Sequence, residues 1–198
     1  MARIGILGGS FNPAHGAHRH ISLEAMRQLR LDDVWWLVSP RNPLKSADGM
    51  APLATRVKRA KAVARHPRIR VSALEEQLGT RFAVDTVAAL QRRFPQHQFV
   101  WIGGGDIVAE LHRWRHWRRF LNRIPLAVLP RPAVSLLGAP ALSWAGWSPT
   151  PPSRWTQAPL PAIIRLHSRL RPESATAIRR NDPDWAQPAR FDEKAKPF

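Results

Sequence analysis

The chain has 198 residues, of which 44% are hydrophobic, and its 31 Lys and Arg residues outweigh 14 Asp and Glu residues to give a formal net charge of +17. This length and apolar content are typical of one globular domain with its own core. The absence of cysteine excludes disulfides and thiolate metal sites, fits a reducing compartment, and leads us to expect a cytoplasmic protein. No apolar run approaches the roughly 18 residues of a membrane span, so we expect no membrane partner.

The excess of positive charge indicates an anionic partner, such as a nucleic acid, a phosphorylated metabolite or an acidic membrane. The basic residues do not form one block, because they are spread over short clusters such as RVKRAK, RWRHWRR and RRN. Arg also outnumbers Lys, which a GC-rich genome explains as well as a nucleic-acid groove does. A basic nucleic-acid-binding protein is therefore an alternative that the charge leaves open, but we do not expect nucleic acid as the partner.

In chain order, the sequence predicts alternating strands and helices. Strands are predicted where the chain is almost continuously apolar, and helices where apolar residues recur at helical spacing. The order is strand 2–9, helix 15–30, strand 33–40, helix 53–65, strand 68–73, helix 85–94, strand 97–104, helix 107–121, strand 124–131, strand 161–168 and the start of a short helix at 173–180. Such alternation is typical of a parallel sheet covered on both faces. We therefore predict an α/β fold, a Rossmann-like doubly wound parallel sheet in a single domain with a small C-terminal helical subregion.

The regular pattern fails after Arg131, where prolines alternate with tryptophans. This composition predicts irregular structure, part of it mobile. The end of the chain is polar, as is typical of a loose terminus. We thus expect one domain over residues 1–180, with an irregular Pro/Trp-rich insertion at 132–160, and a flexible polar tail at 181–198.

The stretch GGSFNPAHGAH directly follows the first predicted strand, at the end where open parallel sheets bind ligands. Its glycines let the backbone approach a ligand closely, and free N–H groups there can point at an anion. The next helix begins near His15, so its N-terminus also favours negative charge. His15 and His18 lie one helical turn apart and can face the same ligand. The stretch therefore predicts a phosphate-binding site.

Two other interpretations of these histidines stay open. A zinc site is possible in principle, but the HxxH spacing lacks the i, i+4 pair and the glutamate of the helical zinc-protease motif. Alternatively, the histidines only cap the helix and pack. His20 lies off the face that His15 and His18 share, so we expect no site role for it.

GGSFNPAHGAH resembles the G-x-F-D-P-x-H-x-G-H signature of the HxGH nucleotidyltransferase superfamily, and SATAIR at 174–179 resembles its second signature, S-S-T-x-I-R. Three further stretches resemble those of bacterial nicotinate-nucleotide adenylyltransferases within that superfamily: WWLVSPRNPLK, TRFAVDTVAAL and FVWIGGGDIVAELHRWRHW. The resemblance covers most of residues 3–131 and again 161–180. It implies that the 1–180 domain is a nucleotidyltransferase domain.

The resemblance implies an enzyme of NAD biosynthesis that transfers the AMP moiety of ATP to nicotinate mononucleotide. The products are deamido-NAD and pyrophosphate, formed by in-line attack without a covalent intermediate. ATP is then a substrate with Mg²⁺, which phosphates and water hold without a protein metal site. Another member of the superfamily, such as a phosphopantetheine adenylyltransferase, is the alternative, and so is an inactive homologue. Homo-oligomerisation is left open.

The resemblance also implies roles for individual residues. His15 and His18 are the expected catalytic residues, which bind the ATP phosphates and stabilise charge in the transition state. On the acceptor side, Thr86 with its neighbouring amides meets the pyridine carboxylate, Asp106 meets a ribose hydroxyl, and Trp114 stacks on the pyridine ring. The expected ATP and phosphate ligands are Gly8, Gly9, Ser10, Phe11, Lys45, Ser174, Thr176 and Arg179.

Each of these assignments has a plainer alternative. Lys45 can be a solvated loop lysine, and the residues of SATAIR can form an ordinary helix cap. Asp85 is as well explained by capping the helix over 85–94 as by a ligand. Trp117 is expected on the same helical face as Trp114, as a packing residue.

The chain departs from the family's pattern in a few places. Asn12 replaces the aspartate after the phenylalanine, Ala17 replaces the glycine of the HxGH motif, and Ala175 replaces one serine of the second signature. The methyl group of Ala17 would hinder phosphate binding if the helix backbone had to approach the phosphate closely at that position. These changes bear on the turnover rate more than on the fold.

Overall fold

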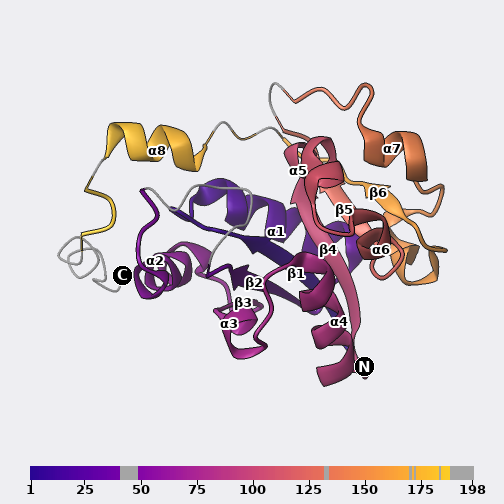
Figure 1. Cartoon of the computed structure of the whole chain (residues 1–198), viewed down its shortest axis with the longest axis horizontal. Coiled ribbons are helices and arrows are strands. Elements are labelled where there is room, and N and C mark those ends of the chain that lie inside the picture. The colour runs from indigo at the N-terminus through magenta and orange to yellow at the C-terminus, as the bar shows by residue number, and fades with distance from the viewer. Residues whose placement is uncertain (41–48, 132–133, 170, 172, 183, 188–198) are drawn as a thin grey trace.

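We describe a computed structural model of the chain, for residues 1–40, 49–131, 134–169, 171, 173–182 and 184–187 (Figure 1). One sheet runs through it, and its strands are β1 (Arg3–Gly9), β2 (Asp33–Val38), β3 (Ile69–Ser72), β4 (Gln98–Gly104), β5 (Leu126–Leu129) and β6 (Ile163–Arg165). The spatial order is β3-β2-β1-β4-β5-β6, and every neighbouring pair is parallel. The predicted Rossmann-like doubly wound sheet is confirmed.

The described part of the chain also forms helices and 3-10 turns, most of which pack on one or the other face of this sheet. They are α1 (Gly16–Leu29), α2 (Leu53–Ala64), α3 (Leu74–Gln77), α4 (Ala83–Arg93), α5 (Gly105–Glu110), α6 (Trp117–Leu121), α7 (Pro140–Ala145) and α8 (Ala175–Asn181), with 3-10 turns η1 (Leu111–Arg113) and η2 (Pro152–Gln157). The side chains of α1, α2 and η2 pack into one hydrophobic cluster, and those of α4 to α7 pack into a second, whereas α8 has no buried residue.

The alternation of side chains along each strand separates these two clusters. On β2, Trp36 and Val38 belong to the cluster under α1 and α2, whereas Trp35 and Leu37 belong to the cluster under α4. Successive side chains of a strand point to opposite faces of the sheet, and each face here meets apolar helices. This is why the strands are almost continuously apolar in the sequence.

The single helix predicted over 107–121 is wrong. The structure breaks it into α5, η1 and α6, because Trp114 is extended (φ −76°, ψ 141°) and His116 is left-handed (φ 51°). The break lets the Trp114 ring pack edge-on against Trp101 and Phe120, at centroid distances of 6.1 and 5.5 Å. Tertiary packing of aromatic rings has overridden local helix propensity.

As a result, Trp114 and Trp117 do not share a helical face. Trp117 packs edge-on against Trp144 of α7, with ring centroids 5.3 Å apart. The expectation that the two tryptophans lie side by side on one helix is therefore wrong. The expectation that Trp117 is a packing residue agrees with its contact.

The segment expected to be irregular, 132–160, holds only α7 and η2 as regular structure among its described residues. Part of it is firmly packed, because Trp155 is 2% exposed and its Nε1–H donates to Leu29 O at 2.9 Å.

In the segment expected to be a loose tail, Trp185 is also buried, and the Arg59 guanidinium lies 5.7 Å from the centre of its ring. No helix in the described ranges is long and apolar enough to cross a membrane.

Candidate active site

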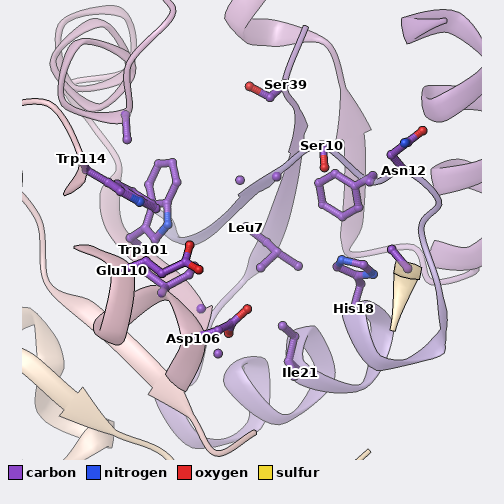
Figure 2. A pocket seen from close by; sticks show the side chains of 18 of the residues that line it. Leu7, Ser10, Asn12, His18, Ile21, Ser39, Trp101, Asp106, Glu110 and Trp114 are labelled. Atoms are coloured by element: carbon purple, nitrogen blue, oxygen red, sulfur yellow. The ribbon is translucent and has the colours of Figure 1, made fainter. Parts of the chain in front are cut away.

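A cleft of about 500 Å³ opens where β1, β2 and β4 end (Figure 2). β1 and β4 are the neighbouring strands between which the sheet reverses its direction of growth, and open α/β sheets bind ligands at the carboxyl ends of such strands. The lining therefore comes from the ends of strands and from the segments that follow them. Figure 2 shows Ser10 and Ser39 beyond β1 and β2, with His18 and Trp114 on opposite sides of the hollow.

Most of the residues predicted from the sequence meet in this cleft. Those that line it are Gly8, Gly9, Ser10, Phe11, His15, His18, Asp106, Trp114, Ser174 and Thr176. The two signatures, which lie more than 150 residues apart in the chain, thus contribute to one site. A direct contact joins them, because Nη1 of Arg179 donates to Asn12 O at 2.5 Å.

The loop after β1 turns sharply at Phe11, whose backbone is left-handed (φ 46°). This conformation is sterically costly for a residue with a Cβ atom, so the surrounding contacts must hold it. The Phe11 ring is 2% exposed, stacks on Trp36 at 5.1 Å and lies 4.8 Å from the His18 ring. The buried ring thereby fixes the turn that brings the chain from β1 to the first turn of α1.

His18 lies in the first turn of α1, and its protonation pattern follows from one hydrogen bond. The backbone N–H of His15 donates to Nδ1 of His18 at 3.2 Å. Because Nδ1 accepts, the proton of the neutral imidazole is on Nε2. His18 therefore offers an N–H donor on the ring atom remote from its own backbone, which suits an anionic ligand.

His15 is the N-cap of α1 and is buried, with 6% of its surface exposed. Burial, together with the nearby Arg131 and Arg59 guanidinium groups and against the opposing charge of Glu173, lowers its pKa from 6.5 to about 4. The imidazole is therefore neutral at pH 7 in the free protein. A polyphosphate bound in the cleft would raise this pKa, because an opposite charge stabilises the imidazolium.

This pKa shift makes the stability of the fold depend on pH. The unfolded chain takes up a proton near pH 6.5 and the folded chain only near pH 4, so the free energy of unfolding falls as the pH falls between these values. We expect His15→Gln to lose less stability than the wild type between pH 7 and pH 4.5, measured by urea unfolding. His112→Gln, at an exposed histidine, should keep the wild-type dependence. Equal slopes for the wild type and His15→Gln would contradict the shift.

Asp106 lies in the first turn of α5, next to the end of β4, and lines the cleft. Its Oδ1 lies 3.3 Å from Nε of Arg131, so the carboxylate has a cationic partner. A Cβ atom on Gly104 would clash with this oxygen and would lie 2.6 Å from the Arg131 nitrogen. Any residue larger than glycine at position 104 would therefore disturb the contact between Asp106 and Arg131. Arg131 also lines the cleft, and the sequence prediction missed it. The available signal was its position at the end of the fifth predicted strand.

The side chain of Thr86 does not reach the cleft, contrary to expectation. Thr86 is fully buried, and its hydroxyl lies 3.1 Å from Oε1 of Glu75 and 3.0 Å from the Thr80 hydroxyl. The residues of this segment that do line the cleft are Phe82 and Ala83, at the start of α4. The reason is helical geometry, since a residue one turn into α4 points into the core.

Glu75 is a second residue that the sequence did not indicate. It lines the cleft although only 5% of its surface is exposed. Burial raises the pKa of this carboxyl group, and hydrogen bonds with Ser39 and Thr86 partly oppose the shift. It belongs to α3, a four-residue helix that was not predicted.

Three further residues that the sequence singled out, Lys45, Ala17 and His20, are not among the described residues that line the cleft. Lys45 lies outside the described residues. Ala17 borders a small separate cavity and is not among the residues that line the cleft, so its methyl group does not obstruct the site. His20 makes its contacts elsewhere, with Nε2 at 3.0 Å from the Ser168 hydroxyl. In the described part of the chain, no three or more His, Cys, Asp or Glu side chains form a group that could hold a metal ion.

A doubly wound sheet with a glycine loop, paired imidazoles and hydroxyls at one cleft defines an α/β protein of the nucleotide-binding class. The chain belongs to the cytidylyltransferase-like family, whose profile matches residues 6–181. A relative from Erythrobacter litoralis (strain HTCC2594), named "Probable nicotinate-nucleotide adenylyltransferase", is 49% identical over 197 residues, covering 96% of this chain and 88% of the relative. A relative of the same name from Parvibaculum lavamentivorans is 46% identical over 182 residues, covering 89% and 90%.

Solved structures support the fold. The nicotinic acid mononucleotide adenylyltransferase of Plasmodium falciparum complexed with NaAD aligns with a TM-score of 0.68, over 91% of this chain and 83% of that chain. The same enzyme complexed with APC aligns with a TM-score of 0.67, over 97% and 94%. Both are 14% identical to this chain, so this likeness concerns the fold alone.

Proposed function

We propose that this protein is a nicotinate-nucleotide adenylyltransferase, which transfers the AMP moiety of ATP to nicotinate mononucleotide and releases deamido-NAD and pyrophosphate in NAD biosynthesis. The observation that carries the proposal is the convergence of both signatures on one cleft: His15 and His18 line it from one end of the chain, and Ser174 and Thr176 line it from the other. Relatives that cover most of the chain carry this enzyme's name.

The reaction needs positioning and charge stabilisation more than covalent chemistry. The phosphate of the mononucleotide attacks the α-phosphorus of ATP in line, and pyrophosphate leaves from the opposite side. His18 donates from Nε2 to an oxygen of the reacting phosphate, where negative charge grows in the transition state. His15 and the backbone amides after Gly8 and Gly9 hold the phosphates of ATP. None of these groups acts as a nucleophile.

The second signature supports the leaving pyrophosphate. Ser174 caps α8, since its hydroxyl accepts from Ala177 N at 3.1 Å, and the Thr176 hydroxyl accepts from Nη2 of Arg179 at 3.3 Å. Arg179 also holds α8 against the loop after β1 through Asn12 O. In this proposal Ser174 and Thr176 contact the β- and γ-phosphates, and Arg179 adds positive charge beside them.

Mg²⁺ accompanies ATP in this proposal and neutralises part of the phosphate charge. Such ions bind mainly through phosphate oxygens and keep several waters. The carboxylate at the switch point, Asp106, lies 3.3 Å from the Arg131 guanidinium and already has a cationic partner. We therefore assign Asp106 to a ribose hydroxyl of the acceptor rather than to the metal.

The other end of the cleft suits a carboxylated pyridine. Trp114 provides a flat aromatic surface for the ring. Three arginines, Arg81, Arg113 and Arg115, line the cleft, and the guanidinium groups of Arg81 and Arg115 lie over the ring of Phe82, the N-cap of α4. Arg115 lies 4.8 Å from the centre of the Phe82 ring, which holds it beside that helix. Positive charge of this kind favours the anionic nicotinate over the neutral nicotinamide.

The test is direct. Purified protein with ATP, Mg²⁺ and nicotinate mononucleotide should produce deamido-NAD and pyrophosphate, both quantified by chromatography and a coupled phosphate assay. Equal use of the nicotinamide mononucleotide would refute the specificity, and use of phosphopantetheine instead would support the alternative within the superfamily. Absence of any adenylyl transfer would remove the enzymatic proposal, and tight DNA binding that weakens steeply with salt would favour the nucleic-acid alternative.

Trp114→Ala should raise the Michaelis constant for nicotinate mononucleotide about 10-fold, because one stacking interaction is worth about 1–3 kcal/mol. The Michaelis constant for ATP should change little. Trp117→Ala is the matched control, since Trp117 packs on Trp144 and is not among the residues that line the cleft. An effect of Trp114→Ala on ATP alone would contradict the stacking role. Steady-state kinetics with each substrate varied in turn decides this.

A further inference from the structure

Arg56, near the start of α2, has a guanidinium group buried behind the floor of the cleft, and 1% of the residue is exposed. Its Nη1 donates to Ser10 O and to Ser39 O, each at 2.7 Å. Its Nε donates to Ala51 O at 2.8 Å, and its Nη2 donates to Pro40 O at 3.1 Å. All four acceptors are backbone carbonyl groups, which come from the loops after β1 and β2 and from the segment before α2.

The guanidinium group of Arg56 is a buried positive charge without a carboxylate partner among the described residues. Burial lowers the pKa of Arg56, yet a guanidinium stays charged in proteins. A buried cation is tolerated only when hydrogen bonds satisfy it, and here the carbonyl dipoles do so. A fixed positive charge therefore lies directly behind the loop that meets the phosphates.

The acceptors matter because two of them belong to residues of the cleft wall. Ser10 and Ser39 both line the cleft, from loops that follow the adjacent strands β1 and β2 (Figure 2). One guanidinium group bonded to both carbonyls links these loops, beside the backbone hydrogen bond that Ser39 N donates to Gly9 O at 2.9 Å. A lysine has the same charge but presents its donors from a single point, so it cannot reproduce the planar fork.

Asn12 makes two further hydrogen bonds to the segment before α2. Its Nδ2 donates to Gly49 O at 2.9 Å, and its Oδ1 accepts from Ala51 N at 3.0 Å. Both backbone groups of Ala51 are therefore held, one by Asn12 and one by Arg56. The amide makes one donor and one acceptor bond here, which an ionised aspartate at this position could not do.

We propose that Arg56 is a positioning residue for adenylyl transfer, which fixes the loop of Ser10 relative to the loop of Ser39 and so sets the geometry across the floor of the cleft. This inference rests on the proposed function. Arg56 itself lies behind the loops and performs no chemistry. In-line attack requires the reacting atoms to be held about 3–3.5 Å apart, and a displacement of about 1 Å can cost about 100-fold in rate. The effect of Arg56 is therefore on turnover.

The experiment compares Arg56→Lys and Arg56→Ala with the wild type, whose activity is established first. At saturating ATP and nicotinate mononucleotide, Arg56→Lys should lower kcat about 10- to 30-fold, and both Michaelis constants should change less than about three-fold. Millimolar guanidinium chloride, far below denaturing concentrations, should restore part of the kcat of Arg56→Ala by refilling the site. Sodium chloride at equal ionic strength should not.

Arg68→Lys is the matched control, because Nη1 of Arg68 also donates to a backbone carbonyl, Leu31 O at 3.3 Å, away from the cleft. It should keep the wild-type kcat. Circular dichroism and thermal unfolding give the folded fraction of every variant, and kcat is expressed per folded molecule. Wild-type kcat in Arg56→Lys, or a loss fully explained by its unfolded fraction, would overturn the inference. If Arg56→Ala does not fold, Arg56→Lys alone decides. An inactive wild type would instead refute the proposed function.

Discussion

Replacing His18 by alanine should lower kcat about 10²- to 10³-fold, the usual cost of removing one donor aimed at a developing negative charge. The Nδ1 atom of His18 accepts from the His15 backbone N–H, so the neutral ring carries its proton on Nε2. The ring position is fixed as well, because Phe11 lies 4.8 Å from it and the His15 ring 3.9 Å. A pre-oriented donor needs no rearrangement during the reaction, which is why its loss should appear in kcat.

His20→Ala is the matched control for this variant. His20 is on the same helix, but its Nε2 contacts the Ser168 hydroxyl and Arg169 O, away from the cleft. It should keep wild-type kinetics. Thermal unfolding should show that His18→Ala costs roughly 1 kcal/mol of stability, as a half-buried side chain would. A large loss of stability with unchanged kcat per folded molecule would show that His18 is only a packing residue.

The convergence of the two signatures was predictable because it depends on sheet topology. In a parallel sheet every strand ends at the same edge, so any loop that follows a strand is a candidate for the site. That rule found the end of β1 at Gly8 and Gly9, the loop that follows it, and the turn before Asp106. It also applies to Arg131, which the prediction overlooked although it is the last residue of the predicted strand 124–131 and lies two residues after β5.

Other parts of the site depend on contacts that no local pattern specifies. The extended backbone at Trp114 exists because the ring packs against Trp101 and Phe120, and the sequence of residues 107–121 alone predicts a continuous helix. Thr86 turns inward and contacts Glu75. Glu75 belongs to α3, whose four residues are too few to show a periodic pattern in the sequence. Long-range side-chain packing therefore sets the end of the cleft beside Trp114, whereas backbone topology sets the end beside His15 and His18.

Gly8 lies at the end of β1, between these two ends of the cleft, and we expect Gly8→Ala to lower the stability of the fold. A Cβ atom on Gly8 would lie 2.5 Å from Cζ2 of Trp101 and 2.8 Å from its Cη2. The ring cannot withdraw easily, since Trp101 is 2% exposed and packs edge-on against Phe120 at 5.3 Å and Trp114 at 6.1 Å. Overpacking of this kind costs about 1–3 kcal/mol. Displacement of Trp101 should also move Trp114 and raise the Michaelis constant for nicotinate mononucleotide.

Gly9→Ala is the control for stability at the neighbouring position. Its Cβ atom would lie 3.7 Å from the nearest ring atom of Phe11, an ordinary van der Waals contact. Urea unfolding should therefore separate the two variants, with Gly8→Ala destabilised and Gly9→Ala close to the wild type. Equal stability would mean that the Trp101 ring adapts without cost. If Gly8→Ala were destabilised but had a normal Michaelis constant for nicotinate mononucleotide, displacement of Trp101 would not move Trp114. Gly8 would then be needed for packing of the core and not for substrate binding.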